Sequence, residues 1–167
     1  MILSLSGLFR YNLRTKEQEV TLEQELEALD DYIHIQQTRF DGRIAYKKQI
    51  LVDPRKVRIP SFTLQPIVEN ALHYGLRSQD EDSEVRIHAY AKNGKLFITV
   101  KDRGRGLTPE QTESIQSGQP LSRSGHTGIG LTNVRERLQL IYGDSSSITL
   151  RNRENGGVKV TIEIPFA

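Results

Sequence analysis

The sequence contains no cysteine, no long apolar run and almost no excess of charge. Without cysteine, disulfide bonds, thiol catalysis and thiolate metal sites are excluded, and a cytosolic setting is favoured. No stretch approaches the roughly 20 apolar residues of a membrane span, and no signal-peptide pattern is present. The formal net charge of +2 over 167 residues gives no reason to expect nucleic acid or an anionic membrane as a partner. These absences leave one globular domain with a sizeable core.

Three segments carry apolar residues at the spacing of amphipathic helices, which are expected over 21–40, 64–75 and 129–142. Thr21 and Gln24 form a capping box at the start of the first, and Thr63 is placed to cap the second. A short apolar stretch, 2–13, predicts a further helix whose partner lies elsewhere. The first long helix also holds an acidic run that we interpret as a solvated face: Glu23, Glu25, Glu27, Asp30 and Asp31.

Alternating apolar and polar residues predict strands over 43–52, 85–91, 96–100, 148–151 and 158–164. Asn93-Gly94 is typical of a two-residue hairpin turn between the second and third of them. The segment 107–127 is polar and rich in glycine, with a single helical turn expected around 109–115. This order of elements predicts an α+β fold: a two-layer sandwich of a mixed β-sheet with helices on one face, preceded by a short N-terminal helix.

Asp102 extends the strand 96–100 and continues its series of core-facing positions, Leu96, Ile98 and Val100. A buried carboxylate needs hydrogen-bond donors. One interpretation makes Asp102 a solvated turn residue, because aspartate before glycine is common in turns. The other makes it an acceptor for a ligand such as adenine, whose exocyclic amino group is a donor.

Two glycine-rich segments support the ligand interpretation. Gly104 and Gly106 let the backbone approach a flat ligand or adopt positive φ. Downstream, "GHTGIGL" opens into a helix, whose N-terminal amides suit phosphate. Neither segment has the spacing of a Walker A loop or of a dinucleotide-binding loop.

A polar strip on the helix 64–75 is the third candidate element. Asn70, His73 and Tyr74 lie three and four residues apart, on one side of the helix. The amide oxygen of Asn70 suits Mg²⁺, which takes few protein ligands together with phosphate and water. Without the neighbouring motifs, Asn70 and His73 would be interpreted as surface residues.

These blocks, "VENALHYG", "DRGRG" and "GHTGIGLTNVRERL", resemble in this order the N box and the two glycine boxes of one ATP-binding (Bergerat or GHKL) fold. Histidine kinases, type II topoisomerases, the Hsp90 chaperones and MutL share that fold. The final "GGVKVTIEIP" resembles the last strand of that fold. The segments "LSGLFRYNL", "VTLEQELEALDDYIHIQQTRF" and "LQPIVENALHYGL" are similar to the autolysin-sensor (LytS-like) group of bacterial sensor histidine kinases. The resemblance covers nearly the whole chain.

The resemblance implies a role for each matching residue. Asp102 should bind the adenine amino group, Asn70 should hold Mg²⁺ against the ATP phosphates, and 107–127 should form a lid. Asn70 and the adjacent Glu69 are the expected catalytic residues, although Glu69 projects about 100° away around the helix. The expected nucleotide-binding set is Asn70, His73, Tyr74, Asp102, Gly104, Gly106, Gly128, Ile129, Gly130 and Leu131.

Residues 1–20 would then be the remnant of a dimerisation and phosphoacceptor region, and 21–167 the catalytic domain. Pro66 stands where hydrolysing members of the superfamily carry a glutamate, so we expect phosphoryl transfer rather than hydrolysis. His73 replaces the lysine usual in the LytS-like group, which implies a weaker, pH-dependent phosphate contact. No block resembling the family's phosphoacceptor histidine, "PHFLFN", is present.

The resemblance therefore implies the ATP-binding domain of a two-component kinase. Its partners would be ATP or ADP, the phosphoacceptor helices and a response regulator, in a full-length homodimer without nucleic acid. The domain would be the cytoplasmic part of a membrane sensor protein and make no membrane contact itself. Two alternatives stay open: a non-catalytic nucleotide-binding or dimerisation module, and a serine kinase of the anti-sigma-factor type with the same fold.

Overall fold

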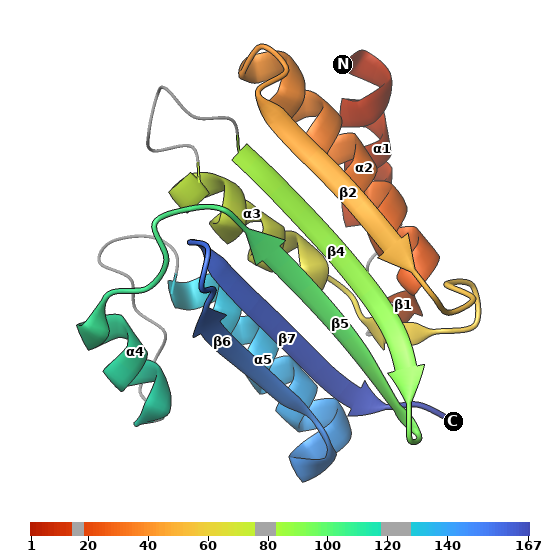
Figure 1. The fold of residues 1–167 in the computed structure, drawn as a ribbon. Helices are drawn as coiled ribbons and strands as arrows, with labels where there is room; N and C mark the ends of the chain where they lie inside the picture. The colour runs from red at the N-terminus through yellow and green to blue at the C-terminus, as the bar shows by residue number, and fades with distance from the viewer. Residues whose placement is uncertain (15–18, 76–82, 118–127) are drawn as a thin grey trace.

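A five-stranded mixed sheet forms one layer of the protein, seen in a computed structural model that describes residues 1–14, 19–75, 83–117 and 128–167 (Figure 1). Its strands, in spatial order, are β2 (Ile44–Ile50), β4 (Ser83–Lys92), β5 (Lys95–Asp102), β7 (Val158–Pro165) and β6 (Ser147–Asn152). Strand β2 runs parallel to β4, and every other neighbouring pair is antiparallel. The predicted mixed sheet is confirmed.

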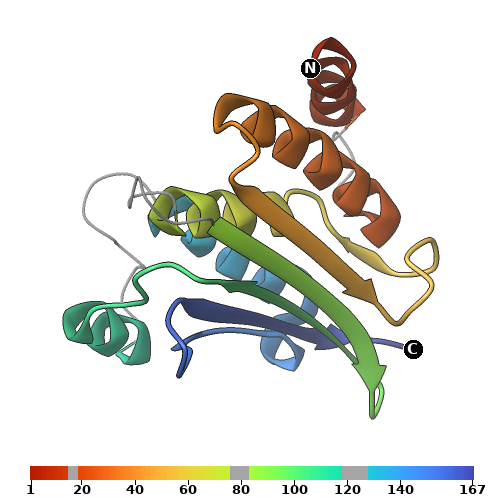
Figure 2. The same cartoon turned by 45° about the horizontal axis from the view of Figure 1, so that its top comes forward.

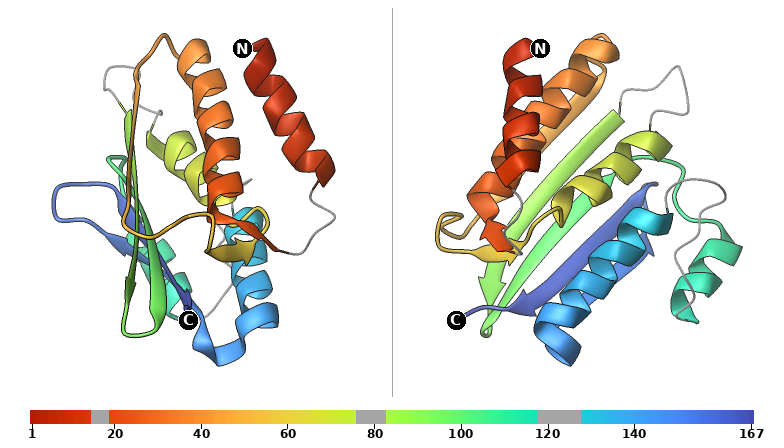
Figure 3. Two further views of the ribbon diagram at one scale, coloured as in Figure 1. Left: turned by 90° about the vertical axis from the view of Figure 1, so that its right-hand side faces the viewer. Right: turned by 180° about the vertical axis from the view of Figure 1, so that it is seen from behind.

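Three helices form the second layer and cover one face of the sheet (Figure 3). They are α2 (Leu22–Arg39), α3 (Leu64–Gly75) and α5 (Gly128–Tyr142), the last followed by a single 3₁₀ turn, Gly143–Ser145. Helix α1 (Ile2–Arg14) lies against α2 on the side away from the sheet (Figure 2). The predicted helical layer and N-terminal helix are therefore confirmed. Among the residues that the structure describes, no helix has both the length and the apolar character that crossing a membrane requires.

The core lies between the two layers because the strands alternate their side chains. The side chains that face the helices are buried. They are Val85, Ile87 and Ala89 of β4, and Leu96 and Ile98 of β5. The β4–β5 register is fixed by a two-residue turn at Asn93-Gly94, where both residues have positive φ (54° and 72°), as a type I′ turn requires. That register places Asp102 directly opposite Val85, on the core side.

Two features of the fold extend beyond what the sequence pattern predicted. Helix α4 (Pro109–Gln116) has eight residues rather than a single turn, and Thr108 caps it through a capping box with Gln111. A small sheet pairs β1 (Glu19–Thr21) with β3 (Arg58–Pro60). Each of these strands has three residues, too few for an alternating pattern to show.

The start of α3 is held by a carboxylate from α2. Glu25 is only 1% exposed, and its two oxygens accept the backbone N–H groups of Phe62 (2.6 Å) and Leu64 (2.9 Å). The hydroxyl of Thr63 donates to the carbonyl of Pro60 instead of capping the helix. The prediction of a solvated acidic face is therefore wrong for Glu25, whereas Glu27 on the same helix is exposed.

We expect Glu25→Gln to lower the free energy of unfolding by about 1–3 kcal/mol. Glutamine keeps one acceptor oxygen but turns an N–H₂ group toward the second amide, which leaves a buried donor unsatisfied. Urea unfolding measures the change, and Glu27→Gln, an exposed substitution on the same helix, should stay within about 0.5 kcal/mol. Equal effects of the two substitutions would contradict this role for Glu25.

Candidate functional site

A hollow of about 600 Å³, part of it open to solvent, lies between the sheet, α3, α4 and α5. Apolar side chains form most of its wall: Ile67, Ala71, Val100, Leu131, Val158 and Val160. Asn70 and Asp102 are the polar residues contributed by α3 and β5. A mostly apolar slot with a few polar groups is typical of a small-molecule site.

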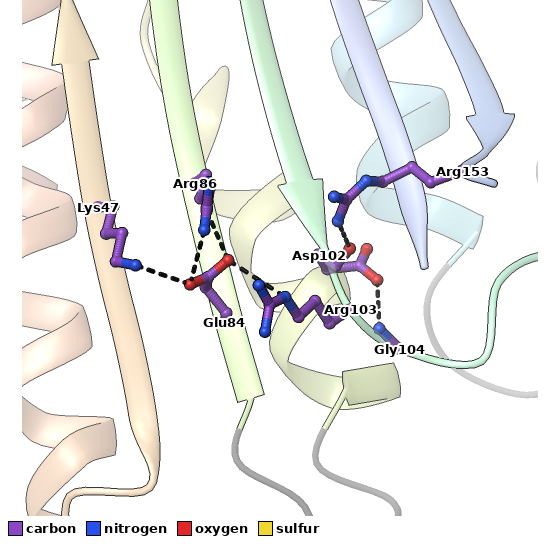
Figure 4. Close-up of polar contacts among 7 residues, drawn as sticks. All are labelled: Lys47, Glu84, Arg86, Asp102, Arg103, Gly104 and Arg153. Carbon is purple, nitrogen blue, oxygen red and sulfur yellow. Dashed lines mark hydrogen bonds and ion pairs between the residues drawn. The ribbon is translucent and has the colours of Figure 1, made fainter. Parts of the chain in front are cut away.

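The carboxylate of Asp102 lies in the wall of this hollow. The residue is 7% exposed, and its Oδ1 accepts the N–H of Gly104 (2.8 Å) and the N–H of Val158 (3.2 Å). Figure 4 shows the carboxylate at the end of β5, with Gly104 just beyond it. The expected core-facing orientation is confirmed, and the interpretation of Asp102 as a solvated turn residue is wrong.

The turn after Asn152 fixes the backbone of Asp102 from the other side. Gly157 has φ +83°, and a Cβ there would lie 2.1 Å from the carbonyl oxygen of Asp102 and 2.8 Å from Oδ1. The guanidinium of Arg153 donates to the same carbonyl oxygen (Figure 4). Neither contact was predicted from the sequence.

The segment that leads from Asp102 into α4 is clamped by Asn152. Its Oδ1 accepts the N–H of Leu107 (2.6 Å), and its Nδ2 donates to the carbonyl of Leu107 (3.0 Å). Gly106 has φ +81°, and a Cβ there would lie 2.8 Å from Oδ1 of Asn152. Gly106 is thus required by its conformation and by the closeness of Asn152, a residue that sequence reasoning missed.

Helix α3 brings one of its four predicted site residues to the hollow. Asn70 is half-buried and lines it. Glu69 is exposed, accepts a hydrogen bond from Gln65 Nε2 (2.9 Å) and does not line the hollow. His73 is exposed at the end of the helix. The backbone of Tyr74 belongs to α3, but its side chain lies outside the described residues.

Helix α5 begins beside the hollow, at Gly128. Leu131 is buried in the wall, and Gly130 packs so closely on α3 that a Cβ would lie 3.2 Å from Cβ of Pro66. Gly128 and Ile129 are placed by the backbone alone. Of the predicted lid, Leu107 and α4 line the hollow, whereas 118–127 lie outside the described residues.

A cluster of charges ties the residue after Asp102 to the sheet (Figure 4). The carboxylate of Glu84 lies 2.5 Å from Nε of Arg86, 3.0 Å from Nζ of Lys47 and 3.4 Å from Nε of Arg103. The hydrogen bond from Arg86, followed by those from Lys47 and the charges nearby, lowers the pKa of Glu84 to about 2. Arg103 is thereby anchored on the sheet face opposite the hollow.

Because the folded-state pKa of Glu84 is depressed, its contribution to stability should be complete above pH about 4.5 and disappear as the pH falls toward about 2. Urea unfolding of wild type and Glu84→Gln between pH 2 and 7 measures this. The stability difference should be largest near neutral pH and close on acidification. A difference that does not change with pH would contradict the charged cluster.

Comparison with known proteins identifies the family of this chain. Residues 60–167 match a family described as histidine kinase-, DNA gyrase B- and HSP90-like ATPases, and residues 1–44 match a histidine kinase family. Sensor histidine kinase YesM of Bacillus subtilis is 33% identical over 99% of this chain. Sensor protein LytS of Bacillus anthracis is also 33% identical over 99% of it. The chain spans little more than a quarter of these relatives, 27% and 28%.

Solved structures share the fold. The catalytic domain of histidine kinase ThkA superposes with a TM-score of 0.65 at 22% identity, covering 88% of this chain and 93% of that one. A blue-light activated histidine kinase domain from Erythrobacter litoralis gives 0.62 at 19% identity, covering 99% and 72%. The family match over residues 60–167, with a buried aspartate at the end of β5 and a glycine-led α5 facing it, shows that this chain belongs to the histidine kinase-, DNA gyrase B- and HSP90-like ATPase family.

Proposed function

We propose that this chain is the ATP-binding catalytic domain of a bacterial two-component sensor histidine kinase of the LytS-like group. The observation that carries the proposal is the buried carboxylate of Asp102 in the wall of a mostly apolar slot. The relatives named above are sensor kinases in which this domain would occupy the matching quarter of the chain. The domain would supply the γ-phosphoryl group of ATP to a histidine outside residues 1–167.

The lining of the slot fits adenine in its apolar character and in hydrogen bonding. Val100, Leu131 and Val158 give apolar contacts to the base. Asp102 offers a charged acceptor to the exocyclic amino group of adenine, whereas guanine would present a carbonyl oxygen at that position and be repelled. The two backbone amides on Oδ1 orient the carboxylate before any ligand arrives.

The other end of the site fits a metal-bound triphosphate. Asn70 offers a neutral amide oxygen at the edge of the slot, and the first amides of α5 form a positive helix end nearby. Mg²⁺, when bound, would neutralise phosphate charge during transfer. In this arrangement Asn70 would hold the metal, and α5 would orient the phosphates.

The residues of α3 favour transfer over hydrolysis. Pro66 has no group that could activate water one turn before Asn70, and the carboxylate of Glu69 is exposed and outside the hollow.

In the proposed step the bond between the γ-phosphorus and the bridging oxygen breaks, and a phosphorus–nitrogen bond to imidazole forms. ADP leaves with the bond electrons, and the imidazole releases its N–H proton. The phosphoryl group would pass on to an aspartate of a response regulator.

The wider assembly is part of the same proposal. Helix α1 would continue the dimerisation and phosphoacceptor helices of a homodimer, and the whole protein would be a membrane sensor with this domain in the cytoplasm. One solved relative of the fold, ThkA, is described in complex with a response regulator, at a TM-score of 0.60 and 19% identity, covering 99% of this chain and 48% of that one. That complex supports a response regulator as the partner of the complete kinase.

The test supplies the phosphoacceptor separately. The chain, radiolabelled ATP and Mg²⁺ are incubated with a purified phosphoacceptor segment from a LytS-like kinase, and acid-labile label on the segment is measured. Asn70→Ala should reduce transfer by at least about 100-fold, while Asn133→Ala, an exposed asparagine on α5, should leave it unchanged. Nucleotide binding without transfer would identify a binding module instead, and rapid ADP release without the segment would identify a hydrolase.

A further inference from the structure

On the sheet face away from the helices, one line across all five strands holds a basic side chain on every strand. The register places Lys47 opposite Arg86, Arg86 opposite Lys101, Lys101 opposite Lys159, and Lys159 opposite Arg151. We call these five residues the cationic row. Neighbouring strands lie about 4.8 Å apart, so the row is about 19 Å long.

The cationic row is unfavourable for the isolated domain. Like charges directly opposite each other on neighbouring strands destabilise a sheet. Partial burial, followed by the charges of Lys159, Arg153 and Arg86, lowers the pKa of Lys101. Glu84 compensates Lys47 and Arg86 at one end. Within the described part of the chain, no carboxylate lies within ion-pair distance of Lys101, Lys159 or Arg151.

Beside the cationic row lies a line of polar side chains: His88, Thr99 and Thr161. His88 is opposite Thr99, and Thr99 is opposite Thr161, one pair along from Lys101. Thr99 is 3% exposed, and its hydroxyl has no hydrogen-bond partner among the described residues. Nε2 of His88 is buried and equally unpaired within the described chain.

The shape of this charge distribution favours one kind of partner. The cationic row is a narrow stripe rather than a broad basic surface, because carboxylates lie on both sides of it. Glu84 borders it on one side. On the other side lies Glu163, which pairs with Lys95 and is the second residue after Lys159 on the same face of β7. A membrane surface or a nucleic-acid duplex would meet these carboxylates as well. A partner with its carboxylates in a single line matches the cationic row better. A helix that carries one acidic residue per turn places a carboxylate about every 5.4 Å along one face.

We propose that the cationic row is a docking site for an acidic amphipathic helix of a partner protein, on the face of the sheet opposite the nucleotide hollow. Four turns of helix, about 22 Å, match the length of the row. The carboxylates would relieve the repulsion between Lys101 and its neighbours. The site lies outside the catalytic machinery and does not depend on the phosphoryl-transfer proposal.

The test uses two fluorescein-labelled, alanine-rich helical peptides of equal composition. One carries five glutamates along a single face, and the other distributes them around the helix. Anisotropy at low salt should show tighter binding of the one-faced peptide by about tenfold. Lys101→Gln with Lys159→Gln should remove that preference, whereas the matched pair Lys56→Gln with Lys92→Gln, exposed cations outside the row, should keep it.

A second readout separates a docking site from a structural feature. Without peptide, the Lys101→Gln, Lys159→Gln variant should melt at a higher temperature than wild type, because the like-charge repulsion is reduced. The proposal is overturned if the variant melts lower, if both peptides bind alike, or if the row variant binds as wild type does. Phosphatidylserine vesicles and a 20-base-pair DNA duplex serve as further probes, and a row-dependent interaction with either one in place of the peptide also overturns it.

Discussion

Asp102→Asn should reduce the affinity of the chain for ATP roughly 100- to 1000-fold while leaving the fold intact. The reason is the way the carboxylate is held: the N–H groups of Gly104 and Val158 both donate to Oδ1. An asparagine would keep its carbonyl oxygen on these two amides. Its N–H₂ group would replace the second oxygen and turn an acceptor into a donor that faces the adenine amino group. The lost charge-assisted hydrogen bond and the opposed donors together amount to about 3–4 kcal/mol.

The same substitution should shift nucleotide preference, since an N–H₂ group at that point would suit the O6 oxygen of guanine. Calorimetric titration of the variant with ATP and GTP measures both affinities. Asp41→Asn, which removes a carboxylate at an exposed turn, is the matched control and should bind ATP as wild type does. An Asp102→Asn variant with unchanged ATP affinity would show that the carboxylate serves only the turn.

Gly157→Ala should destabilise the domain by at least about 4 kcal/mol, a large part of the 5–15 kcal/mol typical of a folded domain. The added Cβ would lie 2.1 Å from the carbonyl oxygen of Asp102, and a backbone atom cannot rotate away as a side chain could. The positive φ of +83° adds about 1–2 kcal/mol. Because the same Cβ presses on Oδ1, any folded fraction should also bind ATP poorly.

Urea unfolding measures this effect, and Gly42→Ala is its control. Gly42 has a similar φ, +75°, but no atom lies within 4 Å of a Cβ at that position. Its substitution should therefore show the conformational cost alone, about 1–2 kcal/mol. If the two alanine variants were equally stable, the close approach of Gly157 to Asp102 would not contribute to the loss of unfolding free energy.

Periodicity was enough to predict the orientation of Asp102. Strand side chains alternate, and the turn at Asn93-Gly94 pins the register, so the core-facing position of Asp102 follows from three apolar residues before it. The limits of α2 followed equally from local signals, because Thr21 and Gln24 form the expected capping box. A similar box at Thr108 and Gln111, with Pro109 between them, was the available signal for the full length of α4.

Contacts between distant segments could not be predicted in this way. Glu25 receives the amide of Phe62 from 37 residues away, Asn152 clamps Leu107 from 45 away, and Val158 donates to Asp102 from 56 away. Each residue sits in a locally ordinary context: an acidic helix face, a strand end, the residue after a glycine turn. Their roles depend on how the layers pack, which local patterns do not encode. The cationic row likewise exists only once the order of all five strands is known.

Calorimetric titration of the wild-type chain with ATP and with GTP, each with and without Mg²⁺, tests the central claim most directly. The account predicts binding that prefers ATP over GTP and strengthens with Mg²⁺, because Asp102 selects the adenine amino group and Asn70 offers an oxygen to the metal. Equal binding of both nucleotides, or no binding of either, would contradict the assignment of this hollow as an adenine nucleotide site.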